Sequence, residues 1–394
     1  MWLSDLRLVL PERVLERGAL LIQDGRIAEI REGDAPANAY SLRGLTAIPG
    51  IIDLHGDMLE RDIEPRPRAR FPIEMALHEL DKRLVGTGIT TAYAAVSFAW
   101  NKSDLRRQET ATEIIQTVNQ MRDTLLADFK VHARFEVANP DTVPILEALL
   151  AHRQVDLVSI MDHTPGQGQY GDTKRYAQFL IEWLNFTEEQ LAPIYARMDQ
   201  KVAELKATPR DWSVVRGIVS AARAHDIIVA SHDDDTPEKV HDQAEMGVTI
   251  SEFPINLEAA FAARERGMHV IMGAPNAYRG ESNTGNLSAL EAIRVGAVDI
   301  LATDYFPAAP LQAAFRLSQK GVLPLHESIK LVTANPADAV GLTDRGRIAV
   351  GCRADLALLE EGAYPRVRAT LRSGALIYSD SEAVRFFQPM VGVG

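Results

Sequence analysis

This chain of 394 residues has a single cysteine, no long apolar run and no excess of basic residues. Its one cysteine, Cys352, has no second thiol with which to form an intramolecular disulfide. No apolar stretch approaches the roughly 20 residues that a helix needs to span a bilayer, which argues against a membrane role. The net charge of -12 argues against nonspecific binding to nucleic acid, because phosphate neutralisation needs a basic surface.

The N-terminal segment also lacks the uninterrupted apolar core of a secretory signal, because Asp5, Arg7, Glu12 and Arg13 interrupt it. A cytoplasmic location is therefore expected. The content of 46% hydrophobic and 24% charged residues is ordinary for a soluble enzyme. The length favours one large domain with a smaller one beside it.

What the chain does contain is a regular alternation of short apolar runs with helical patterns. This alternation predicts an α/β fold with a parallel sheet over residues 49-342, and the eight candidate strands match the number that a (β/α)8 barrel of the TIM type requires. The strands are expected at 49-55, 89-96, 131-137, 155-161, 226-231, 248-253, 268-273 and 298-303. The interval from about 172 to 225 is too long for a simple crossover, so we expect a helical insertion over the barrel mouth or an oligomer surface.

The two ends of the chain predict a second, smaller unit. Residues 1-48 show the alternation and turn signals of an antiparallel sheet, with Asp24 and Gly25 as a hairpin turn. Residues 343-394 carry similar short strands and turn glycines. We expect these two segments to form one composite β-sandwich domain that flanks the barrel.

Five apolar runs end abruptly in a charged or imidazole side chain, at the strand ends where barrel enzymes carry their catalytic groups. These side chains are His55 and Asp57 after the first strand, Glu136 after the third, Asp162 or His163 after the fourth, His232 after the fifth and Asp304 after the eighth. Buried charge is costly unless it is paired or bound to metal, so the recurrence predicts a metal site. Imidazole and carboxylate ligands suit Zn²⁺, Mn²⁺ or Fe²⁺, with Zn²⁺ the expected ion.

Longer strings around these positions carry a resemblance. They are PGIIDLHGDMLER at the first strand, MDHTPGQ at 161-167, SHDDDT at 231-236, SEFPINLEAA at 251-260, MGAPNAYRG at 272-280, TDYFPA at 303-308 and GCRADL at 351-356. They resemble segments of the amidohydrolase superfamily and, within it, of the PhnM family. That family contains the α-D-ribose 1-methylphosphonate 5-triphosphate diphosphatases of the carbon-phosphorus lyase pathway. The likeness spans nearly the whole barrel and both ends of the chain.

The resemblance implies cleavage of a 5′-triphosphate between its α and β phosphorus atoms, with release of pyrophosphate. It implies one or two divalent ions, with most ligands from His55, Asp57, Glu136, His163 and His232, and Asp304 as the general base. Asp162, Asp233, Asp234 and Glu252 are reserve candidates. Because large barrels of this superfamily are commonly dimers or tetramers, a homo-oligomer is expected.

An anionic small-molecule substrate must meet a local basic patch in so acidic a chain. Arg61, Arg66, Lys174 and Arg279 are the expected partners of a polyphosphate, since guanidinium groups match phosphate oxygens. Asn286 lies in a glycine-containing loop whose backbone N-H groups could also face an anion.

Several departures from the family pattern fall in these anion-binding segments. Met58 stands where family members usually have Asn, and Gly168 stands where they usually have Arg. The loop GESNTGN replaces GGSHSGN and brings in Glu281 and Asn283. Loss of polar or cationic donors and gain of a carboxylate would weaken the binding of a triphosphate.

Three classes of function are therefore weighed. The first is metal-dependent hydrolysis of the phosphoanhydride. The second is a diverged amidohydrolase that acts on another phosphate ester or anhydride, on a cyclic amide or on a deaminase substrate. The third is a noncatalytic scaffold, which the presence of every strand-end ligand candidate argues against.

Overall fold

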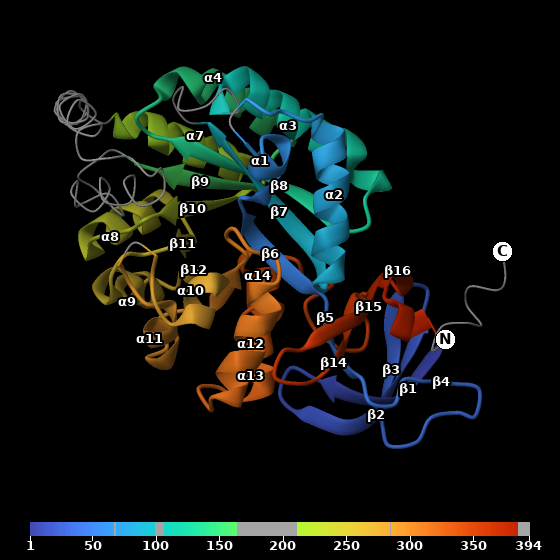
Figure 1. Cartoon of the computed structure of the whole chain (residues 1–394). Helices are drawn as coiled ribbons and strands as arrows, with labels where there is room; N and C mark the ends of the chain where they lie inside the picture. Colours follow the sequence, from blue (N-terminus) through green and yellow to red (C-terminus); the bar gives the residue numbers. More distant parts are fainter. Residues whose placement is uncertain (67, 99–105, 164–210, 284, 385–394) are drawn as a thin grey trace, which may run out of the picture.

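The computed structural model describes residues 1-66, 68-98, 106-163, 211-283 and 285-384. Its larger unit is a sheet of eight parallel strands that are hydrogen-bonded in chain order (Figure 1). The strands are β6 (Ile51–Gly56), β7 (Ile89–Phe98), β8 (Asp128–Glu136), β9 (Leu157–Met161), β10 (Ile228–His232), β11 (Ile250–Glu252), β12 (His269–Gly273) and β13 (Ile300–Ala302). A parallel bridge between Gly56 and Asp304 joins the last strand to the first. The expected (β/α)8 barrel is confirmed, and all eight predicted strands overlap an observed one.

Burial on both faces explains why these apolar runs form strands. Every residue of β6 and of β7 is buried, as expected for a parallel sheet whose outer face is covered by helices. Inside the barrel an apolar floor includes Leu157, Ala230 and Ile250. Ala230 and Ile250 each precede a site residue, His232 and Glu252, by two positions, so floor and site share one face of the strand. The polar site therefore rests directly on a packed apolar layer.

The helices follow the strands around the outside of the barrel (Figure 1). They are α1 (Met58–Ile63), α2 (Ile73–Gly86), α3 (Gln108–Met121), α4 (Val143–Ala151), α7 (Trp212–Ala224), α8 (Pro237–Met246), α9 (Leu257–Glu265), α10 (Ala274–Arg279), α11 (Ala289–Arg294), α12 (Ala309–Gln319), α13 (Leu325–Lys330) and α14 (Ala334–Ala339). In α2, Ile73, Leu77, Leu80 and Leu84 are buried, which is the helical spacing of one apolar face. Of the expected insertion at 172-225, residues 172-210 lie outside the described part, and the remainder contains α7.

Strands from both ends of the chain share a second sheet. Its members are β1 (Trp2–Val9), β2 (Val14–Gln23), β3 (Arg26–Glu32), β4 (Tyr40–Ser41), β5 (Thr46–Pro49), β14 (Leu356–Glu360), β15 (Arg366–Arg372) and β16 (Ala375–Ser379). The junction is the antiparallel pair of β5 and β14, in which Ala47 lies opposite Leu358. Figure 1 shows this sheet beside the barrel, with the first and last colours of the chain side by side. The boundaries 1-48 and 343-394 remain a prediction.

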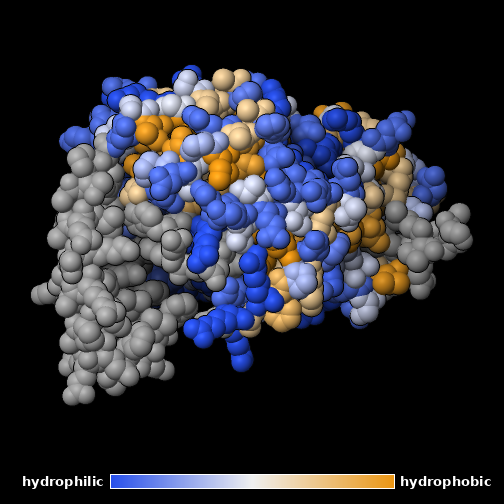
Figure 2. Space-filling model, turned by 90° about the horizontal axis from the view of Figure 1, so that it is seen from above, coloured by the Kyte–Doolittle hydropathy of each residue, from blue (hydrophilic) through white to orange (hydrophobic). Residues whose placement is uncertain are grey.

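The described part of the face shown in Figure 2 is mainly polar. On the face shown in Figure 2, hydrophilic residues surround smaller hydrophobic patches in the described part of the chain. Among the described residues, no helix combines the length and apolar character that crossing a bilayer requires.

Candidate active site

The predicted ligands meet at the C-terminal ends of the barrel strands. His55 is on β6, Asp57 directly precedes α1, Glu136 ends β8, His163 follows β9 and His232 ends β10. The ring centroids of His55 and His232 are 5.7 Å apart, and those of His163 and His232 are 5.4 Å apart. Side chains that are far apart in sequence therefore form one cluster, as the strand-end pattern predicts.

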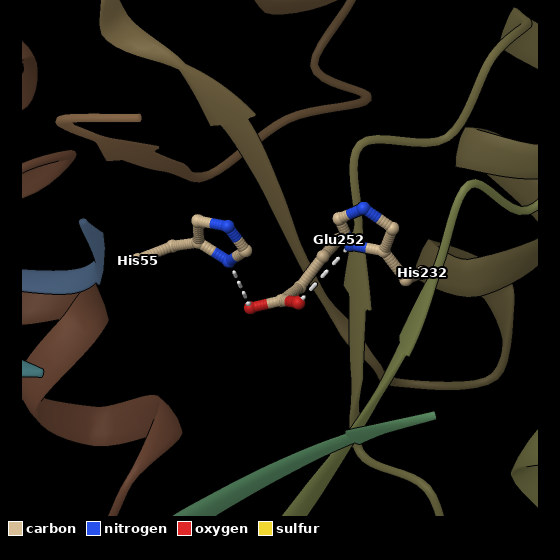
Figure 3. Close-up of side chains that lie close together, drawn as sticks. All are labelled: His55, His232 and Glu252. Carbon is tan, nitrogen blue, oxygen red and sulfur yellow. Dashed lines mark hydrogen bonds and ion pairs between the residues drawn. The ribbon is translucent and has the colours of Figure 1, made fainter. Parts of the chain in front are cut away.

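Glu252 lies beneath two of these histidines. It is fully buried at the end of β11, and its two carboxylate oxygens face the Nδ1 atoms of His55 at 3.2 Å and of His232 at 3.4 Å (Figure 3). A carboxylate that accepts a hydrogen bond from Nδ1-H fixes the tautomer and leaves Nε2 as the ligand atom. The contacts of this reserve candidate therefore match a residue that positions histidines.

The buried charges around Glu252 support one another. Burial disfavours the carboxylate, but the imidazoles of His132 and His55 outweigh it and hold the pKa of Glu252 well below its usual range. Burial likewise lowers the pKa of His55, but the carboxylates of Glu252 and Asp57 outweigh it and raise that pKa to about 10. Ser159 extends the network by donating a hydrogen bond to Glu252 at 2.5 Å.

A second group of potential ligands consists of His163, His232 and Asp233. Nε2 of His163 is 3.7 Å from one carboxylate oxygen of Asp233, and Nε2 of His232 is 3.7 Å from the other. The oxygen Oδ2 of Asp233 is buried and has no hydrogen-bond partner among the described residues. Because a buried carboxylate oxygen is costly without a partner, this group fits a divalent cation, as does the group of His55, His232 and Glu252.

The remaining acidic candidates differ in their surroundings. Asp234 accepts hydrogen bonds from the hydroxyls of Ser231 and Ser251 at 2.5 and 2.6 Å, so it links β10 to β11. Glu136 accepts from the backbone N-H of His163 at 3.1 Å and faces its Nδ1 at 3.0 Å, which orients that imidazole. Asp162 is half-buried directly after β9.

Asp304 lies at the junction of β13 and β6. Burial and the nearby charge of Asp57 raise the pKa of Asp304 to about 6. Its φ angle of 56° is left-handed, as are those of Asp233 at 51° and Phe253 at 54°. Such backbone strain in non-glycine residues is typical of functional sites, and here it turns the chain after β10, β11 and β13.

Two of the expected substrate-binding arginines, Arg61 and Arg279, lie around Tyr305, the residue that follows Asp304. The guanidinium of Arg61 lies 5.9 Å from the centre of the Tyr305 ring. Asn283 donates a hydrogen bond to the Tyr305 hydroxyl at 3.1 Å and accepts one from Arg279. Glu281 forms an ion pair with Arg279 at 3.1 Å. Two expected substrate-binding arginines are thus brought together, and both departing loop residues contact one of them.

The other substrate-binding candidates lie in loops or outside the described residues. Arg66 lies in an exposed loop, where its backbone pairs with Ala69. Asn286 is half-buried in the loop that precedes α11. Lys174 and Gly168 lie outside the described residues.

The sequence reasoning missed Arg134, whose side chain projects into the same cluster from β8. Its guanidinium donates a hydrogen bond to Asp57 at 2.9 Å and contacts Nε2 of His232 at 3.3 Å. Arg134 precedes Glu136 by two positions, so both lie on one face of the strand. That spacing was the signal that could have revealed it.

Comparison with known proteins agrees with this geometry. A family model described as "Amidohydrolase family" matches residues 73-378. The chain is 37% identical over 365 residues to the α-D-ribose 1-methylphosphonate 5-triphosphate diphosphatase of Escherichia coli (strain K12), covering 91% of this chain and 94% of that protein.

Two further comparisons reach more distant proteins. The chain is 25% identical over 383 residues to an imidazolonepropionase of Deinococcus deserti, covering 91% of this chain and 89% of that protein. The crystal structure of D-hydantoinase from Bacillus sp. AR9 superposes with a TM-score of 0.64 at 12% identity, covering 96% of this chain and 95% of that one. At this identity the superposition supports the fold alone.

Proposed function

The chain belongs to the amidohydrolase family, and from this membership we propose that it is the diphosphatase that releases pyrophosphate from α-D-ribose 1-methylphosphonate 5-triphosphate in phosphonate catabolism. The chain is a hydrolase of a family that is generally metal-dependent. The observation that carries the choice of substrate is the 37% identity to the Escherichia coli diphosphatase, because it extends over 91% of the chain. The match therefore includes the barrel and the composite sheet as well as isolated motifs.

The geometry supports hydrolysis at the strand ends. Of the five predicted metal ligands, His163 and His232, joined by Asp233, form the group whose buried carboxylate oxygen has no hydrogen-bond partner in the described part of the chain. A bound divalent ion would lower the pKa of a water molecule and neutralise charge on the attacked phosphoryl group. In this proposal the ion is Zn²⁺, with Mn²⁺ or Fe²⁺ as alternatives.

The remaining residues would bind substrate and move protons. Asp304 would accept the proton of the attacking water, since its raised pKa keeps it a useful base near neutral pH. Arg61, on the last turn of α1, and Arg279, on the last turn of α10, would bind the phosphates above it. Asp57 would be needed at the centre of the cluster, as a ligand or as the partner of Arg134.

The test is a pyrophosphate-release assay on a ribosyl 5′-triphosphate, coupled to elemental analysis of the purified protein. We expect bound metal and pyrophosphate release from the wild type, and loss of release in Asp57→Ala. Asp62→Ala, in the helix α1 that directly follows Asp57, is the matched control, because Asp62 pairs with the surface residue Arg83. Metal without pyrophosphate release would contradict the proposed substrate.

One observation favours a second candidate, a diverged hydrolase with a less charged substrate. Glu281 and Asn283 already engage the guanidinium of Arg279, which reduces the positive charge available to a triphosphate. The relative named imidazolonepropionase also leaves room for a cyclic amide. A panel of phosphate monoesters and cyclic amides, assayed beside the triphosphate, separates the two candidates.

The small-molecule substrate is consistent with the hydrolase family. A homo-oligomeric assembly and a cytoplasmic location remain predictions.

A further inference from the structure

A buried arginine is an unusual neighbour for a metal site. Only 6% of Arg134 is exposed, and it projects from β8 among the carboxylates and imidazoles of the cluster. Arginine stays protonated in proteins, and the guanidinium lies against the carboxylate of Asp57, so the side chain is charged. The cluster thus contains a fixed positive charge supplied by the chain itself.

The guanidinium of Arg134 contacts two of the predicted metal ligands, Asp57 and His232. One nitrogen of the Arg134 guanidinium lies 2.9 Å from a carboxylate oxygen of Asp57, and another lies 3.3 Å from Nε2 of His232. An ion that uses Asp57 as a ligand would have to displace the guanidinium from it, whereas the group of His163, His232 and Asp233 does not include Asp57. At the Asp57 oxygen such an ion and the guanidinium would lie at hydrogen-bond range, where two cations repel each other strongly because water is excluded.

The two groups of potential metal ligands differ in the hydrogen bonds that their carboxylates already make. In the inner group of His55, His232 and Glu252, the carboxylate already faces the Nδ1 atoms of both histidines. In the outer group of His163, His232 and Asp233, Oδ2 of Asp233 is buried without a hydrogen-bond partner among the described residues. The outer group therefore gains more from binding a cation.

We propose that the site holds a single metal ion at His163, His232 and Asp233, and that the guanidinium of Arg134 takes the place of a second ion. Metal sites with two ions place them about 3.5-4 Å apart, so that both neutralise the reacting phosphoryl group. Here the planar guanidinium supplies one of those charges, and its Nε-H, which is buried without a partner among the described residues, remains able to donate a hydrogen bond.

The inference rests on the metal dependence of the proposed function, and the test counts ions without using the substrate. The full chain is saturated with Zn²⁺, freed of excess ion and analysed for zinc per chain. We expect one ion in the wild type and in Arg134→Lys, which keeps the charge. We expect about two ions in Arg134→Met, which removes the charge and frees Asp57. Arg83→Met is the matched control on the surface and should hold one ion.

A second measurement covers the case in which Arg134→Met fails to fold. The wild type is loaded with Mn²⁺, and its electron paramagnetic resonance spectrum should show isolated ions rather than a spin-coupled pair. Two zinc ions per wild-type chain, a coupled manganese pair, or one zinc ion in a folded Arg134→Met variant would overturn the inference. Two ions with pyrophosphate release would leave the proposed function standing. One ion without release would contradict only the proposed substrate.

Discussion

The backbone N-H of Asp304 donates a hydrogen bond to the carbonyl oxygen of His55 at 2.9 Å, where the last barrel strand meets the first. In return, the backbone N-H of Asp57 donates to the carbonyl oxygen of Asp304 at 2.8 Å. These bonds use only backbone atoms. They fix the position of Asp304 next to the cluster without engaging its carboxylate.

Replacing the Asp304 carboxylate should therefore affect chemistry more than structure. We expect Asp304→Asn to lower kcat by about 10²- to 10⁴-fold, which is the usual contribution of a general base. Metal content should stay at the wild-type value. Steady-state kinetics with elemental analysis checks this, and a variant that keeps its metal and loses less than tenfold in kcat would show that another group is the base.

The raised pKa of Asp304 predicts an acid limb in the pH profile. Burial and the charge of Asp57 raise this pKa to about 6, and a base must be deprotonated to act. Below about pH 6 the rate constant kcat/KM should therefore fall by about tenfold per pH unit. The profile is measured at saturating metal from pH 4.5 to 8. A flat profile down to pH 4.5 would be inconsistent with Asp304 as the base.

The contacts of Glu252 with two histidines predict an effect on metal affinity. A glutamine can accept a hydrogen bond from Nδ1-H through its oxygen only, so Glu252→Gln leaves one histidine poorly oriented. We expect metal affinity to drop by about 10- to 100-fold. Competition with a chelator measures the affinity, and Glu258→Gln, on the exposed side of α9, is the control. Equal affinities in both variants would mean that Glu252 does not orient the ligands.

The contacts of Arg279 with Glu281 and Asn283 predict that this loop affects KM for charged substrates. Removing the carboxylate in Glu281→Ala frees the guanidinium, and KM for a ribosyl triphosphate should fall by about two- to fivefold, as expected for an exposed ion pair worth up to about 1 kcal/mol. KM for the corresponding ribosyl monophosphate should fall less. Glu265→Ala removes an exposed carboxylate from α9 and should leave both KM values unchanged. An equal response from the two substrates would argue against a role for Arg279 in reading charge.

The barrel could be predicted because its signal is local. Strands such as β10 and β12 are short apolar runs with helical patterns on either side, and each overlaps its predicted range. The helix α8 likewise begins at a local signal, since the Thr236 hydroxyl caps it and Pro237 occupies its first turn. Such features depend on neighbours within a few positions.

The roles inside the site could not be predicted in the same way. Whether Glu252 binds an ion or orients histidines depends on its distance from His55, a residue nearly 200 positions away. The spacing of Arg134 and Glu136 places both on one face of the strand, but it does not identify Asp57 as the carboxylate that Arg134 meets. These relationships exist only once the barrel closes, so strand-end position alone could not assign them.

The pairing of β5 with β14 determines which part of the fold can form last. As the chain grows from its N-terminus, β5 must wait for about 300 residues to be made before its partner exists, and contacts so distant in sequence form late. Until then Thr46–Pro49, which leads directly into the first barrel strand, presents an open strand edge. The composite sheet is therefore completed last. A chain interrupted before residue 356 would keep this strand edge unpaired by β14.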